Sequence, residues 1–384
     1  MGTGERSGVD RKTFLLLGAG VLGGVGAAAP EGEAGAEDLL APLPDVLEGG
    51  RVSPPDGGVP GGDPGVGPVE VPTRVPFPFR AAGYRALPRL AEDRRPWRDR
   101  PVPWSRVTPD DKHTYLDRHG VIMYRPNRKA RGYDQPVTQL QFGLGCVTSY
   151  RRERDPARKR LFLRRARAQA ERLIARKTVT RGAWYFTFPF DFTHGTHKGI
   201  RYRAPWYSGM AQGEALSFFV QLAELDGVTL EERLLYRTAA DGAFASLLRG
   251  DDEWPWVVNR DSDGYLWIQL YPMDPTETSD YTFNGMLFAA LGLWDYARFT
   301  GHPLARQLYD GALTTAAHFF PELRNTGGWA YYCRTHRIPT PTYHGHVVRL
   351  YRQLAWQTGS RRFARMAELL AGDTPARRGG RLSG

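Results

Sequence analysis

Tyrosine, arginine and histidine side chains gather in three short segments of this sequence, and together they could transfer protons at carbon. The side chains concerned are Tyr271, Tyr331, Arg334, His336, Tyr343 and His344. A phenol with an unperturbed pKa of about 10 is a poor base unless nearby cations stabilise its anion, as an arginine or a protonated histidine can. An arginine can also hold a carboxylate, and the enolate that forms when the neighbouring carbon loses its proton. This combination favours proton abstraction at C5 of a uronic acid, whereas any one of these tyrosines could equally serve packing.

Other chemistries have less support in the sequence. The close histidine pairs, His194/His197 and His344/His346, have neither the HExxH spacing nor a neighbouring pair of cysteines, so no zinc site is predicted. No glycine-rich loop opens a helix after a buried strand, and no Gly-x-Ser-x-Gly elbow occurs. We therefore expect a site that works without a metal or a cofactor.

Four similar helix pairs must position the reactive side chains. Each pair begins with an apolar helix that opens near Pro136, Tyr207, Phe283 or Tyr343, at intervals of 71, 76 and 60 residues (207 − 136, 283 − 207 and 343 − 283). A second, amphipathic helix follows each of them, and aromatic, strand-like links join three pairs to the next. A pair cannot bury its apolar face alone, so the recurrence favours a repeat architecture. We predict a mainly α fold, an (α/α) barrel or toroid of helix hairpins over 136–371, with the aromatic links around its mouth.

The beginning of the chain has the features of an export signal. Residues 1–29 combine Arg11-Lys12, a short apolar run and a final Ala27-Ala28-Ala29, which indicates a twin-arginine-like or general secretory signal. The run is too short and too rich in glycine for a stable membrane span. We expect a secreted or cell-envelope protein with no stable membrane span after cleavage; an uncleaved N-terminal anchor is the alternative.

Composition divides the rest of the chain. Segments rich in Pro, Gly and charge cannot bury enough apolar surface to fold, so they predict disorder on either side of the folded part. The predicted regions are a disordered acidic linker over 30–75, a small β-rich segment over 76–135 with a hairpin at 115–124, the helical domain over 136–371 and a disordered tail over 372–384.

The folded part is much more basic than the net charge of +11 suggests. Residues 1–73 hold 4 of the 52 basic and 11 of the 41 acidic residues, which leaves 48 basic and 30 acidic residues over 74–384, a net charge of +18. A surface this basic attracts polyanions. For an exported protein we expect an acidic polysaccharide as the partner rather than nucleic acid, although the arginine surplus could also reflect codon bias and solubility.

Several segments together carry a family resemblance. They are 206–213 (WYSGMAQG), Tyr271-Pro272, 283–285 (FNG), 292–295 (GLWD), 331–334 (YYCR) and Tyr343-His344, with 136–144 (PVTQLQFGL) extending the series to the first helix. In residues and in order they resemble the C-terminal domain of the D-glucuronyl C5-epimerases, over roughly residues 130–365.

The resemblance implies an (α/α) barrel behind a β-rich part, and conversion of D-glucuronate into L-iduronate in heparosan-type chains. It places the catalytic tyrosines on Tyr271, Tyr331 and Tyr343, and substrate binding on Arg334 and Asn284. Further candidates for substrate binding in the same segments are Tyr207, Gln212, His336 and His344.

One position departs from the family pattern. The general-base glutamate of the family would fall on Leu270, and the loop that follows contains Asp274, Glu277 and Asp280. One of these carboxylates could substitute for it, a tyrosine could serve as the second proton relay, or turnover could have been lost.

Three functions follow from these alternatives. The first is a uronate C5-epimerase, an isomerase that needs a proton-transfer group on each face of the sugar. The second is a polysaccharide lyase with similar residues, and the third is a non-catalytic protein that binds acidic polysaccharide. A glycoside hydrolase is a weaker fourth, because no convincing carboxylate pair is present. A homodimer is compatible with each of them.

Overall fold

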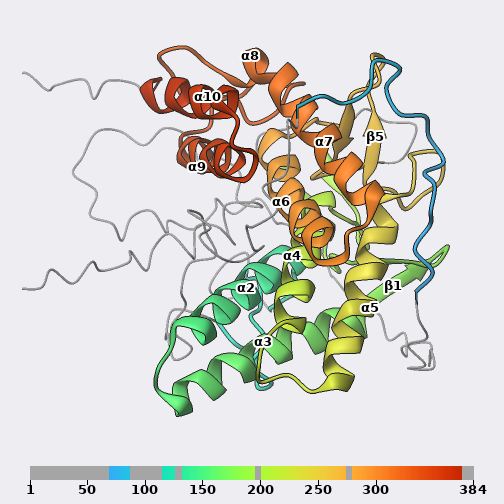
Figure 1. Ribbon diagram of the computed structural model, residues 1–384, viewed down its shortest axis with the longest axis vertical. Coiled ribbons are helices and arrows are strands. Elements are labelled where there is room, and N and C mark those ends of the chain that lie inside the picture. Colours follow the sequence, from blue (N-terminus) through green and yellow to red (C-terminus); the bar gives the residue numbers. More distant parts are fainter. Residues whose placement is uncertain (1–68, 87–114, 126–131, 195–199, 274–278, 374–384) are drawn as a thin grey trace, which may run out of the picture.

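The computed structural model describes residues 69–86, 115–125, 132–194, 200–273 and 279–373 (Figure 1). The predicted export signal, most of the predicted linker and nearly all of the predicted tail lie outside these residues. Within the described part, no helix is both long and apolar enough to cross a membrane.

Four helix pairs make up most of the described structure, as the sequence predicts. Local signals start and stop them: Asp155 caps α3 by accepting a hydrogen bond from the Ala157 amide, Thr229 and Glu232 form a capping box on α5, and Gly301 ends α6 in the left-handed conformation. The pairs are α2 (Pro136–Arg152) with α3 (Pro156–Arg176), α4 (Gly209–Ala223) with α5 (Leu230–Leu247), α6 (Phe283–Thr300) with α7 (Pro303–His318), and α9 (Pro341–Thr358) with α10 (Arg361–Gly372); the short α8 (Phe320–Leu323) follows α7.

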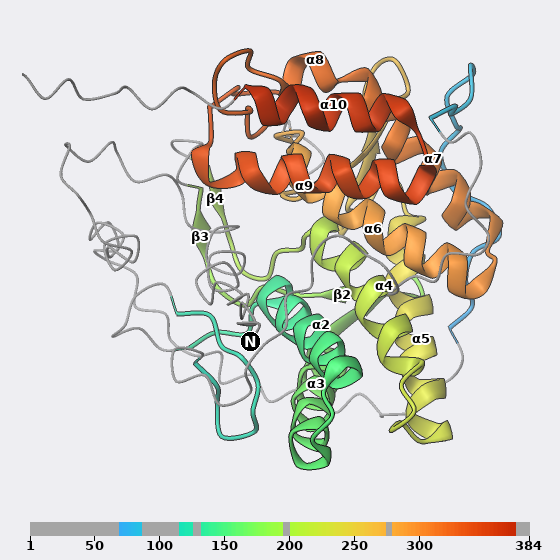
Figure 2. The same cartoon turned by 60° about the vertical axis from the view of Figure 1, so that its left-hand side comes forward.

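The first helices of the pairs form an inner row and the second helices an outer one. Helix α4 packs against both α2 and α6, and α6 packs in turn against α9. Every residue of α4 is buried, whereas α3 and α10 bury only one face, as expected for central and peripheral helices. Figure 2 shows α2–α3 and α9–α10 at opposite ends of the row. No extensive packing joins α2 to α9 in the described residues, so the inner row forms an arc, and its closure into a toroid stays a prediction.

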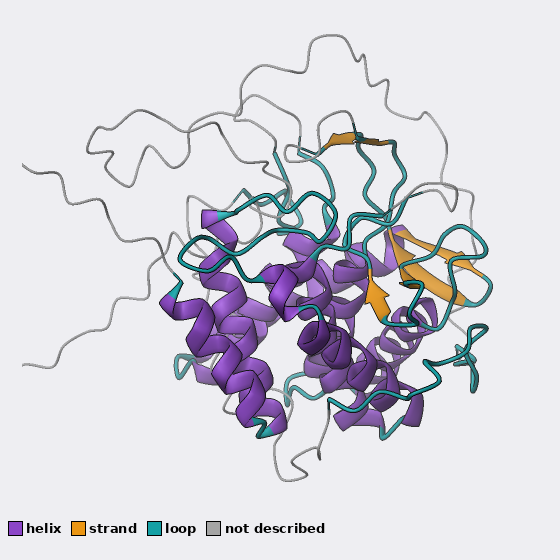
Figure 3. Cartoon of the chain, turned by 90° about the horizontal axis from the view of Figure 1, so that it is seen from above, coloured by secondary structure: helices purple, strands orange, loops and turns teal. Residues whose placement is uncertain are grey.

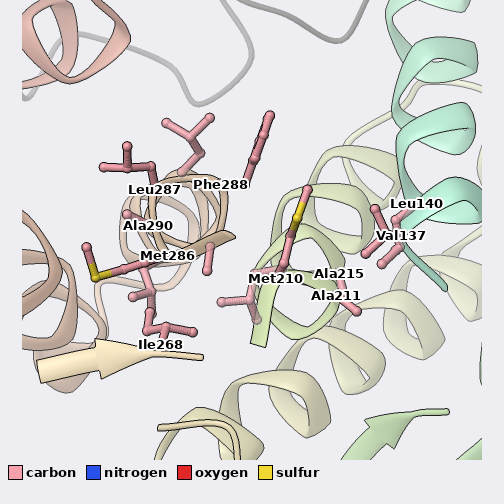
Figure 4. Close-up of a cluster of buried hydrophobic side chains, with 14 of the residues drawn as sticks. Val137, Leu140, Met210, Ala211, Ala215, Ile268, Met286, Leu287, Phe288 and Ala290 are labelled. Atoms are coloured by element: carbon pink, nitrogen blue, oxygen red, sulfur yellow. The ribbon is translucent and has the colours of Figure 1, made fainter. Parts of the chain in front are cut away.

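Small residues allow α4 and α6 to pack closely at the centre of the arc. A Cβ atom on Gly292 would lie 1.7 Å from the carbonyl oxygen of Gly213, and one on Gly213 would lie 2.2 Å from the Cα atom of Ala289. On the other side of α4, Val137 and Leu140 of α2 face it (Figure 4). The core of the protein therefore runs along α4.

The aromatic links form small antiparallel hairpins. They gather, with the longer loops, on one side of the helices (Figure 3). The hairpins pair β1 (Lys177–Thr180) with β2 (Ala183–Phe186), β3 (Phe192–Thr193) with β4 (Arg201–Tyr202), and β5 (Val258–Arg260) with β6 (Leu266–Ile268). This is the side on which the sequence places the mouth.

The segment before α2 is described only in part, since 87–114 and 126–131 of the predicted β-rich segment lie outside the described residues. Its described residues contribute isolated antiparallel bridges, Leu116 to Ile122 and Tyr124 to Tyr133, and no longer strand. The predicted hairpin at 115–124 is thus present only as a tight turn closed by a single bridge. Val69, Val71 and Val75 pack against the core, so the packed part of the chain begins within the segment predicted as linker.

Candidate active site

Backbone contacts bring three distant segments to the start of α6. Gln269, at the end of the β5–β6 hairpin, accepts a hydrogen bond at its backbone carbonyl from the Gly209 amide (2.8 Å) and at its side chain from the Tyr281 amide (3.2 Å). The loop after α8 is held there as well, because the Phe283 amide donates to the Tyr332 carbonyl (3.2 Å) and the Arg334 amide to the Tyr281 carbonyl (3.1 Å). These contacts hold the segment after β6, the residues just before α6 and the loop between α8 and α9 next to one another.

Three tyrosines meet in this region. The Tyr332 hydroxyl donates to the Tyr271 hydroxyl over 3.5 Å, and the rings of Tyr332 and Tyr343 lie 5.1 Å apart between centroids. All three side chains are buried, and burial raises the pKa of each phenol above its usual value of about 10. Each phenol is therefore protonated at neutral pH and acts as an acid rather than a base.

A buried histidine and a buried carboxylate complete the group. The ring of His194 lies 4.7 Å from that of Tyr271 and 5.6 Å from that of Tyr332. Asp280 is buried, and its charge adds to the effect of burial in raising the pKa of both Tyr271 and Tyr332. Asp280 Oδ1 is also 3.5 Å from Nδ1 of His336.

Tyr331 and Arg334 do not join this group. Tyr331 is half-buried, and its ring lies beneath the guanidinium of Arg337 at 4.8 Å. Arg334 Nε lies 3.0 Å from a carboxylate oxygen of Glu322, and Arg334 Nη1 lies 3.6 Å from one of Asp261. The residue expected to hold a substrate carboxylate is therefore already paired with two carboxylates of the protein.

The two predicted histidines do not stabilise a tyrosine anion in the expected way. His336 is exposed and faces Asp280, while Nδ1 of His344 accepts a hydrogen bond from the Ala330 amide (3.0 Å). Burial lowers the pKa of His344 below its usual value, which favours the neutral ring. Within the described part of the chain, neither His336 nor His344 provides the cationic surroundings predicted for the tyrosines.

Two further substrate-binding candidates, Gln212 and Tyr207, are held by contacts within the protein. The Gln212 side chain accepts from the Phe186 amide (3.0 Å) and donates to the Trp184 carbonyl (2.6 Å), so it connects α4 to β2. Tyr207 is buried edge-on against Tyr185, with 5.4 Å between ring centroids. These contacts occupy both side chains within the protein.

Asn284 remains available for a ligand. It is buried in the first turn of α6, one residue after the amide that bonds Tyr332, and neither its amide nitrogen nor its amide oxygen has a hydrogen-bond partner among the described residues. The hydroxyl of Tyr343 is likewise buried without a described partner. Unpaired buried polar groups are costly, and such groups concentrate where a substrate supplies the missing contacts.

Comparison with known families identifies the region that contains this group. The family model described as the D-glucuronyl C5-epimerase C-terminus matches residues 180–370. Residues 180–370 belong to the D-glucuronyl C5-epimerase C-terminal family. An epimerase-like activity, that of an isomerase, goes with this membership. The match includes all three buried tyrosines but begins after both α2 and α3, at the last residue of β1, so it does not include the first helix pair to which the sequence resemblance extends.

The buried group differs from the sequence prediction in two members. Tyr332, and not its neighbour Tyr331, contacts Tyr271 and Tyr343, and the alternation of side chains in the short bridge at Tyr331–Pro339 places the two tyrosines on opposite faces. His194 was considered only as part of a metal pair, and its long distance in sequence from Tyr271 gave no sign of their contact.

Proposed function

We propose that this chain is a C5-epimerase of glucuronate residues in an acidic polysaccharide. The observation that carries the proposal is the meeting of Tyr271, Tyr332 and Tyr343 with Asp280 in a buried group within the epimerase-family region. Epimerisation requires one group that removes the C5 proton and another that returns a proton to the opposite face. A carboxylate and several protonated phenols supply both kinds of group.

The proposed roles follow from the kinds of group present and from the raised pKa values of the phenols. Asp280 accepts the proton from C5, and the electron pair of the broken C–H bond moves into the substrate carboxylate as an enolate. The phenol of Tyr343, which burial keeps protonated, donates its proton to the other face of C5. The hydrogen-bonded phenols of Tyr271 and Tyr332 stabilise the negative oxygen of the enolate. Exchange of protons with water then returns Asp280 and Tyr343 to their starting states.

A second function, binding without turnover, has one observation in its favour. Leu270 is buried at the position expected for the base glutamate, and its Cβ lies only 2.5 Å from where a Cβ on Gly285 would be. An apolar side chain packed in this way cannot transfer a proton. Turnover then needs another group, and we assign it to Asp280, because Asp274 and Glu277 lie outside the described residues.

Incubation with glucuronate glycans in deuterated water tests these alternatives. We expect deuterium at C5 by proton NMR with the wild-type protein, and a loss of about 10²- to 10⁴-fold in exchange rate for Asp280→Asn. The variant should still bind the glycan. Binding without exchange by the wild type would support the non-catalytic function, and an unsaturated product absorbing in the ultraviolet would indicate a lyase.

We also propose that the protein meets this polysaccharide after export. The proposal is supported by the sequence of residues 1–29 and by the net charge of +18 over 74–384. A mature N-terminus beyond residue 29 by mass spectrometry, and glycan affinity that falls as salt is raised, are the expected results. An intact Met1 or Gly2 terminus would contradict cleavage, and an affinity independent of salt would contradict the charge argument.

A further inference from the structure

At the edge of the tyrosine group, helix α9 carries several N–H and O–H groups that have no acceptor among the described residues. Tyr343, His346 and Arg349 follow one another at intervals of three residues, so their side chains are neighbours along the helix surface. The rings of Tyr343 and His346 lie 6.3 Å apart. The guanidinium of Arg349 reaches back toward the start of the helix, where its Nη1 atom lies 3.8 Å from a Cβ placed on Gly345.

The contact between Arg349 and His346 fixes the tautomer of the histidine. Nη2 of Arg349 contacts Nδ1 of His346, and because an arginine can only donate, Nδ1 must accept. The remaining ring proton is then on Nε2, which has no hydrogen-bond partner among the described residues. Burial, with the charge of Arg349, lowers the pKa of His346 to about 4, which keeps the ring neutral at pH 7.

Arg349 lacks the acidic partner that similar arginines have. It is half-buried, yet no carboxylate of the described residues lies within ion-pair distance of it, in contrast to Arg334 with its two carboxylates and Arg324 with Asp373. Desolvating a charge without a counterion costs free energy. A bound anion would offset this cost.

We propose that Arg349 and His346 bind the carboxylate of the uronate whose C5 faces Tyr343, an assignment that rests on the proposed function. Arg349 offers a planar pair of N–H groups suited to a carboxylate, and His346 adds the Nε2 proton. The carboxylate carbon is bonded directly to C5, so a carboxylate held beside Tyr343 brings C5 to the phenol. Arg349 thus takes the role that the sequence assigned to Arg334.

Paired glycans test the assignment directly. One is a glucuronate polysaccharide, and the other is the same polysaccharide with its carboxyl groups reduced to hydroxymethyl groups, which leaves any sulfate in place. We expect Arg349→Gln to weaken binding of the carboxylated chain by about 10- to 100-fold, the usual effect of losing hydrogen bonds to a charged group, and to leave binding of the reduced chain unchanged. Arg349→Lys, which keeps the charge but loses the fork, should be intermediate.

Arg352→Gln is the matched control, because this arginine is exposed on the same helix and the charge change is identical. Equal losses in the Arg349→Gln and Arg352→Gln variants would overturn the assignment, as would a loss confined to Arg334→Gln. Wild-type protein that does not distinguish the two glycans, or binds neither, would also overturn it. Discrimination that depends on Arg349 without exchange at C5 would leave the binding site intact and refute only the epimerase function.

Discussion

Adjacent tyrosines with different surroundings allow a sharp test of the site. Tyr332 is buried, and its hydroxyl bonds that of Tyr271, whereas Tyr331 is half-buried beneath Arg337. The change from tyrosine to phenylalanine removes one oxygen in either case. We expect Tyr332→Phe to suppress C5 exchange and Tyr331→Phe to leave it almost unchanged.

The expected magnitude follows from the contacts. Removing a group that transfers a proton or stabilises the developing charge costs about 10²- to 10⁴-fold in rate, which corresponds to about 3 to 5 kcal/mol in the activation barrier. The free energy of unfolding should change far less, because the hydrogen bond from Tyr332 to Tyr271 is long at 3.5 Å and an ordinary hydrogen bond contributes only about 1 kcal/mol to stability. A large kinetic effect in a folded variant would therefore report chemistry.

The assay is the rate of deuterium incorporation at C5, followed by proton NMR at a saturating glycan concentration. Urea titration of each variant gives the free energy of unfolding and controls for loss of structure. Equal losses of exchange in the Tyr331→Phe and Tyr332→Phe variants would refute the placement of the two side chains. Full exchange by Tyr332→Phe would show that this phenol takes no part in the reaction.

Three further substitutions test the fold around the site. Burial raises the pKa of Glu214, which accepts a hydrogen bond from Gln141 (2.8 Å), above its unfolded value of about 4.3. The folded chain then holds a proton that the unfolded chain loses, so the free energy of unfolding should fall by about 1.4 kcal/mol per pH unit between about pH 4.3 and the folded pKa. Urea titrations at pH 5 and 7 measure this fall, and the part that Glu214 causes should be missing in Glu214→Gln. Gly292→Ala should destabilise the protein by about 3 kcal/mol or more, because its Cβ would meet the backbone oxygen of Gly213. Gly372→Ala is the control, because a Cβ at that position would have no atom within 4 Å. Equal melting temperatures of the two variants would contradict this packing. Leu270→Glu should lower the melting temperature without increasing exchange, because it buries a carboxylate against Gly285; a gain in exchange would show that position 270 still reaches the substrate.

Much of the fold could be predicted from the sequence because its signals are local. The apolar runs beginning at Pro136 and Phe283 start helices at those residues, and the break at Gly301 ends one. The arrangement of the pairs in space could not be predicted in the same way. Closure of a ring would depend on contacts between α2 and α9, which lie about 200 residues apart, and no local pattern specifies such contacts. The β-rich segment stays a prediction, because 87–114 and 126–131 lie outside the described residues and the described part forms isolated bridges such as Tyr124 to Tyr133.

The site was predictable in its segments but less so in its side chains. Tyr271 and Tyr343 both contact Tyr332. Their segments could be recognised because Tyr271 follows a predicted strand-like link and Tyr343 opens a predicted helix. The choice between Tyr331 and Tyr332 depends on which face of a short bridge meets the core, and a shift of one residue reverses it. The assignment of Arg334 failed to anticipate its carboxylate partners, because Glu322 and Asp261 come from separate elements.

In the proposed reaction, Asp280 would supply the proton-transfer group that is missing where residue 270 is a leucine. Leu270 and Asp280 lie at the two ends of one connection, between β6 and α6, and both ends are held by Gln269, whose backbone carbonyl bonds Gly209 and whose side chain bonds Tyr281. A carboxylate at the far end of this connection is therefore brought back to Tyr271, whose pKa its charge helps to raise. A general base needs only to reach the substrate proton with a suitable pKa, and its place in the sequence does not matter. The leucine can then serve packing against Gly285 while the carboxylate serves the reaction.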